Sequence, residues 1–173
     1  MLETFYRQLF QPQEAPPSLP GALLIGGLVL LVITLNAGGS LRMGSQGLLL
    51  LFILFGLASL LGLFWLSASL GMLLRLLGET PDPGQLWVGI VTGLWPLLLS
   101  GCALAMQRWT PALGGLWSAV IALGTLATLT LAIAQTQTIP RLKVLVAITA
   151  ALGLSLASLG GLIVWPIMLF WGL

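Results

Sequence analysis

The sequence predicts an all-α integral membrane protein, with five transmembrane helices in one bundle and a short interfacial amphipathic helix before them. Hydrophobic residues make up 58% of the chain and charged residues only 6%, whereas a soluble domain carries roughly 25% charged residues. Five stretches lack any charge: 15–41, 43–74, 83–107, 109–140 and 144–173. Each exceeds the ~20 residues that a helix needs to cross a bilayer. Helix is expected throughout, because backbone groups in lipid must pair within their own segment.

The first element, in residues 1–20, is expected to lie on the membrane surface. Its apolar residues recur at helical spacing, with Glu3, Arg7 and Gln8 between them, which is typical of an interfacial amphipathic helix. The apolar residues are Leu2, Phe5, Tyr6, Leu9 and Phe10. Prolines then indicate an extended connector up to Pro20. The chain therefore divides into an N-terminal segment, 1–20, and a transmembrane domain, 21–173.

The five spans are expected near the following residues: 21–40, 47–70, 86–106, 113–134 and 145–171. The strongest loop signal is 80–84, where two prolines, an acid and a glycine fall together. The second helix is predicted to run from about Ser45 to Leu77, about 50 Å at 1.5 Å per residue. It must therefore tilt, or leave the hydrocarbon near Ser67.

Basic loop residues predict the orientation of the bundle. With five spans, Arg7, Arg75, Arg141 and Lys143 lie on one side, and Arg42 and Arg108 lie on the other. The side richer in basic residues is normally cytoplasmic. The N-terminus is therefore expected in the cytoplasm.

Composition also excludes several classes of function. The chain has no histidine and one cysteine, Cys102, which removes the usual ligands of haem and zinc and the histidine of a Ser-His-Asp triad. Its six cationic residues are scattered, which argues against nucleic-acid binding. No ionisable residue is predicted deep in a span, which argues against ion-coupled transport. We expect no enzyme, no cofactor and no metal.

Small residues and prolines mark the candidate contact sites within the spans. Gly89 and Gly93 form a small-xxx-small pattern, which favours close helix packing inside the bundle over contact with a partner or a second copy. Pro96 and Pro166, each preceded by tryptophan, predict helix kinks. A structural kink is favoured over a substrate site between kinked helices.

The second predicted loop is the other candidate for partner contact. Arg75, Glu79 and Asp82 gather there, and the two acids are the only ones beyond residue 14. An exposed loop offers no burial to shift the pKa of a carboxyl group. We therefore favour a hydrated loop most, a docking surface for a partner next, and an active site least.

The order of these features resembles that of bacterial members of the Yip1 domain family. A short amphipathic start, Phe5 to Pro12, precedes the spans; the second span ends in a Leu- and Gly-rich stretch, 64–78, and the third contains Trp95-Pro96. The resemblance implies a five-span fold with a cytoplasmic N-terminus and no catalytic residues. Eukaryotic relatives are trafficking adaptors that contact GTPases through long N-termini. Only about 20 residues precede the first span here, so that contact is not carried over.

Three hypotheses follow. The first is a non-enzymatic scaffold, assembly factor or adaptor that contacts another membrane protein, or a second copy, through helix faces. The second is an accessory subunit of a photosynthetic or respiratory complex. The third is a transporter or lipid-handling protein with a cavity near Pro96 or Pro166. All three place the chain among lipids, in a bacterial inner membrane or a thylakoid membrane.

Overall fold

The computed structural model describes residues 18–155, all of them helical or in short turns. The elements in order are α2 (Leu19–Ser40), α3 (Ser45–Leu76), α4 (Pro83–Gly93), the 3-10 helix η1 (Trp95–Leu99), α5 (Ser100–Trp109) and α6 (Pro111–Gln137). A further helix covers 141–155, the described start of the predicted fifth span. The predicted amphipathic helix and Pro166 lie outside the described residues.

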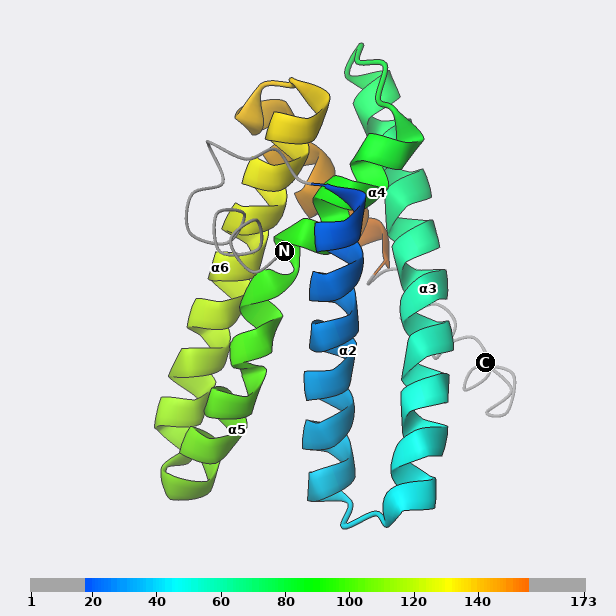
Figure 1. The fold of residues 1–173 in the computed structure, drawn as a ribbon. Coiled ribbons are helices and arrows are strands. Elements are labelled where there is room, and N and C mark those ends of the chain that lie inside the picture. Colours follow the sequence, from blue (N-terminus) through cyan, green and yellow to red (C-terminus); the bar gives the residue numbers. More distant parts are fainter. Residues whose placement is uncertain (1–17, 156–173) are drawn as a thin grey trace, which may run out of the picture.

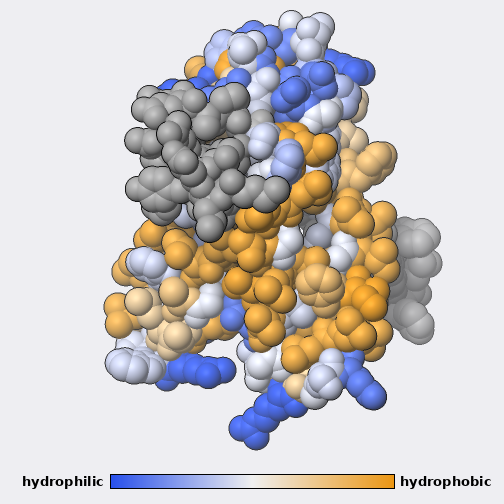
Figure 2. All heavy atoms as spheres, in the orientation of Figure 1, coloured by the Kyte–Doolittle hydropathy of each residue, from blue (hydrophilic) through white to orange (hydrophobic). Residues whose placement is uncertain are grey.

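The helices stand side by side in two antiparallel pairs (Figure 1). One pair is α2 with α3, and the other is α5 with α6; α4 lies between the pairs at their upper end. The four candidate spans Leu19–Ser40, Ser45–Leu76, Pro83–Trp109 and Pro111–Gln137 are long and apolar enough to cross a membrane. Figure 2 shows a broad hydrophobic band with hydrophilic residues gathered at both ends of the bundle.

The start of α2 differs from the prediction by two residues. Pro20, expected in the connector, lies in the first turn of α2. The Ser18 side chain caps this turn by accepting a hydrogen bond from the Gly21 amide, 3.4 Å. Proline suits a first turn because its missing N–H would have no partner within the helix. The end of α3 at Leu76 lies one residue from the expected Leu77.

The main core lies at one end of the bundle, where four helices meet. It joins Leu70 and Leu74 of α3 to buried residues of α4, α6 and 141–155; these are Leu86, Ile90, Leu129, Ile133, Ala134, Val144, Ala147, Ile148 and Ala151. Toward the other end, α3 has no buried residue in its most apolar stretch of 18 residues. α3 is therefore buried only near its C-terminal end, whereas α5 and α6 still pack against each other at the other end of the bundle.

Two left-handed residues end the helices at the packed end. At the end of α3, Gly78 has φ +82°, and the Glu79 amide donates to the Leu74 carbonyl, 3.0 Å, as in a Schellman motif. After α6, Thr138 occupies the same conformation with φ 54°, and the Ile139 amide donates to the Ala134 carbonyl, 3.2 Å. A β-branched residue is strained there.

We predict that Thr138→Gly stabilises the protein. Relief of the left-handed strain is expected to raise the free energy of unfolding by about 1 kcal/mol, measured by denaturation in mild detergent. The matched control is Thr110→Gly, because Thr110 has φ −148° and glycine relieves no strain there. A loss of stability in Thr138→Gly would contradict the prediction.

Candidate functional site

The third span is broken at Pro96, and the break is the centre of the candidate site. The α-helix stops at Gly93, and five residues of 3-10 helix follow before α5 resumes. Proline cannot donate the backbone hydrogen bond of a continuous helix. The Leu97 amide instead donates a hydrogen bond to the Leu94 carbonyl at 3.0 Å, the i to i−3 pattern of a 3-10 helix. The kink predicted at Pro96 falls within this interruption of the span by 3-10 helix.

A threonine of α6 compensates for the break. The Thr128 hydroxyl donates to the Gly93 carbonyl at 2.7 Å, the oxygen that the Leu97 amide would approach in a regular helix. A carbonyl without a partner is costly in apolar surroundings. The Thr92 hydroxyl, one residue earlier, is buried without a partner in the described part of the chain. The break is thus held in place by α6, with polar groups gathered around it.

A partly polar cavity of about 490 Å³ opens beside the break, between α2, α5 and α6. Its polar lining comes from all three helices: Asn36, Ser40, Ser100, Gln107 and Ser118. The Asn36 side-chain amide donates to the Ser100 hydroxyl, 3.3 Å, across the cavity wall. These groups are uncharged donors and acceptors, so the cavity suits a neutral polar group rather than an ion.

An apolar cavity of about 450 Å³ lies on the other side of α2, toward α3 and α4. Glycines of both long helices line it, among them Gly27 and Gly62, and a Cβ on either would meet nothing within 4 Å. Ile33 and Leu97 line both cavities. A partly polar cavity and a more apolar one therefore adjoin at the broken span.

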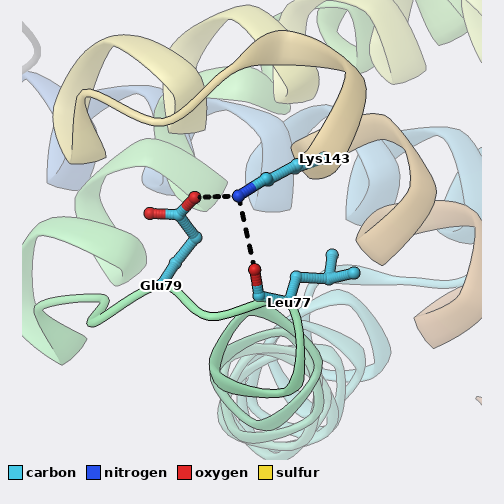
Figure 3. Close-up of polar contacts among 3 residues, drawn as sticks. All are labelled: Leu77, Glu79 and Lys143. Atoms are coloured by element: carbon cyan, nitrogen blue, oxygen red, sulfur yellow. Dashed lines mark hydrogen bonds and ion pairs between the residues drawn. The ribbon is translucent and has the colours of Figure 1, made fainter.

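At the end of the bundle that holds the main core, polar contacts join the loop after α3 to the end of α6 and the start of the helix 141–155 (Figure 3). Lys143 Nζ lies 2.6 Å from Glu79 Oε1 and donates to the Leu77 carbonyl at 3.3 Å. The Asp82 amide donates to Gln137 Oε1, and Gln137 Nε2 donates back to the Asp82 carbonyl, each at 2.9 Å. These bonds connect the loop after α3 to the last residue of α6 and to the first turn of the helix 141–155.

The loop ion pair is predicted to contribute little to stability. In a double-mutant cycle of Glu79→Gln and Lys143→Gln, we expect a coupling free energy below about 1 kcal/mol, because the Lys143 side chain is 42% exposed. Raising the salt concentration should reduce the coupling further. A coupling of several kcal/mol, measured by unfolding in detergent, would show instead that the pair is desolvated.

The structure places the predicted contact residues in two groups. Gly89 and Gly93 are buried and face α6: a Cβ at Gly93 would lie 2.6 Å from Leu129 Cα, and one at Gly89 would lie 2.8 Å from Thr136 Oγ1. Internal packing, the favoured interpretation, thus accounts for both glycines. They offer no surface to a partner in this arrangement.

The predicted loop residues do not form one cluster. Asp82 caps α4, accepting from the Gly84 amide at 2.7 Å and the Gln85 amide at 3.2 Å. Glu79 binds Lys143, whereas Arg75 is exposed and lines a separate groove beside α3. No group of three potential metal-ligating side chains occurs within residues 18–155.

Sequence reasoning missed three of the polar residues that matter most here. These are Asn36, Thr128 and Gln137, none of which was assigned to a site from the sequence. Opposite charges on Glu79 and Lys143, in loops predicted on the same side, were the one available signal that those loops meet.

These features define the class: an α-helical protein whose described residues, 18–155, include four helices long and apolar enough to cross a membrane. Comparison of the chain with protein-family models, curated proteins and solved structures gave no match. The resemblance to the Yip1 domain family accordingly stays a prediction from the sequence.

Proposed function

We propose that this chain is a non-enzymatic membrane scaffold or assembly factor that binds another membrane protein through α3. The observation that carries the proposal is the packing of α3. It is the most apolar of the four candidate spans, yet none of the residues in its most apolar stretch is buried. Helix association in lipid depends on close van der Waals packing, and α3 lacks that packing over most of its length.

The exposed side chains of α3 supply the contact surface. Leu61 and Phe64 are 72% and 75% exposed, and Leu57 and Trp65 lie on the same stretch. Among the described helices in Figure 1, α3 stands at one edge of the bundle, and α2 is its neighbour along the lower part. An adaptor of the Yip1 type, an accessory subunit of a larger complex and a homo-oligomer would all use such a face. The membrane would be a bacterial inner or thylakoid membrane, with the N-terminus cytoplasmic.

Photo-crosslinking in native membranes tests this proposal. A photoreactive residue at Leu61 is expected to give a discrete protein adduct. The matched control is Leu123 on α6, which is 67% exposed, while α6 is anchored by seven buried residues. Leu123 should therefore crosslink only lipid. Lipid-only products at Leu61, or the same protein adduct at both positions, would reject α3 as the contact face. Co-migration with a pigment or respiratory complex on a native gel would identify the accessory-subunit case.

The cavities at the broken span favour a second candidate function, the handling of a lipid-like molecule. An amphiphile with a neutral polar group matches the partly polar cavity and the apolar one beside it, since ligand sites are mostly apolar with a few placed polar groups. Gly62→Leu would fill the apolar cavity and should lower the amount of lipid that co-purifies. Gly115→Leu is the control, because a Cβ at Gly115 also meets nothing within 4 Å and Gly115 lines neither cavity. Unchanged lipid content in Gly62→Leu would remove this candidate.

A further inference from the structure

The end of α3 near its loop forms a groove that shares only Phe64 with the contact surface described above. With 32 residues, α3 is about 48 Å long, against about 33 Å for the 22 residues of α2. In Figure 1 its last turns extend past the start of α2. A groove of about 460 Å³ runs along these turns, between α3 and the prolines that begin α4. Its apolar walls include Phe64, Ala68, Met72, Pro83 and Leu86.

An unneutralised cation lies in the same groove. Arg75 lines it and forms no ion pair with any residue of the range 18–155. The two neighbouring acids are engaged elsewhere: Glu79 binds Lys143, and Asp82 caps α4. The groove thus combines a free guanidinium at the helix end with an apolar channel leading from it.

We propose that this groove binds one anionic phospholipid, with the phosphate on Arg75 and an acyl chain along the face of α3. A guanidinium recognises phosphate oxygens through paired, charge-assisted hydrogen bonds. The helix α3 is longer than the ~30 Å hydrocarbon core of a bilayer. If its first turns lie within that core, its last turns therefore reach the level of the lipid headgroups. Hydrophilic residues gather at this end of the molecule, above the apolar band (Figure 2).

Gly71 makes room for the acyl chain. It lines the groove, and a Cβ there would meet only Leu86 Cδ2, at an ordinary 3.8 Å. A larger side chain at this position would therefore occupy the groove without displacing the backbone. Arg75 and Gly71 allow the headgroup and acyl parts of the site to be tested separately.

The test measures lipid binding to the purified full chain by native mass spectrometry. Phosphatidylglycerol and phosphatidylcholine with identical acyl chains are compared. We expect about fivefold tighter binding of phosphatidylglycerol, since one interfacial arginine contributes about 1 kcal/mol toward an anionic lipid. Arg75→Gln should abolish the preference, and Arg75→Lys should retain most of it. Arg141→Gln is the matched control at the same end of the bundle, because Arg141 does not line the groove, and it should keep the preference.

Two further arms test the nature of the ligand. Gly71→Leu should weaken the binding of both lipids while leaving their ratio unchanged. Soluble glycerol 3-phosphate should not compete, because it lacks the acyl chain. The proposal would be overturned if the wild type bound the two lipids equally, or if glycerol 3-phosphate competed. It would also be overturned if Arg141→Gln lost the preference for phosphatidylglycerol as fully as Arg75→Gln. Crosslinking at Leu61 is a separate readout, so failure here leaves the scaffold proposal standing.

Discussion

Gly93→Ala is expected to lower the free energy of unfolding by about 3 kcal/mol, at the upper end of the usual cost of overpacking. The added Cβ would lie 2.6 Å from Leu129 Cα and 2.9 Å from Leu129 N. Both are backbone atoms of α6, so no side-chain rotation can relieve the clash. The Thr128 hydroxyl bonds the Gly93 carbonyl at 2.7 Å, and a displaced α4 would lose that bond as well.

The measurement is denaturation in mild detergent, followed by circular dichroism. Gly115→Ala is the matched control on α6, because a Cβ there meets nothing within 4 Å. Alanine should leave stability unchanged or raise it by up to about 1 kcal/mol at that position, through its better helix propensity. If Gly93→Ala is as stable as Gly115→Ala, α4 and α6 do not pack as closely as the structure shows.

Sequence patterns predicted the long helices well, because lipid imposes simple requirements on them. A charge-free run from 43 to 74 has few alternatives to helix, and α3 indeed spans Ser45–Leu76. Turn residues likewise placed the loop at 80–84, and α4 begins there at Pro83 with Asp82 as its cap. The described start of the predicted fifth span is helical from 141. For these elements, the local sequence was sufficient to predict the structure.

The cavities and loop contacts could not be predicted because they depend on which distant helices meet. Asn36 and Ser100 are 64 positions apart, and nothing local in the sequence indicates that α2 faces α5. The Gly93 carbonyl freed by the interruption at Pro96 accepts a hydrogen bond from Thr128, 35 positions away in α6. Arg75 was singled out from the sequence, but the groove beside it arises only when α4 folds back along α3.

Leu74→Ala is expected to have the second large effect, because α3 has a single point of firm attachment. Its only buried residues are Leu70 and Leu74, and Leu74 is fully buried in the main core. In lipid the truncation costs little through hydrophobic transfer, since lipid tails are as apolar as leucine. The loss arises from the cavity left among α3, α4 and α6, for which about 2–3 kcal/mol is reasonable.

The control is Leu61→Ala, which removes the same atoms from a side chain that is 72% exposed and leaves no cavity. Its stability should be unchanged within about 0.5 kcal/mol. Amide hydrogen exchange should localise the effect. Leu74→Ala is expected to increase the exchange rates along α3, while the amides of α6 stay protected from exchange. If exchange rises equally in both helices, the bundle opens as one cooperative unit. In that case α3 would not be the loosely attached helix that the scaffold proposal requires.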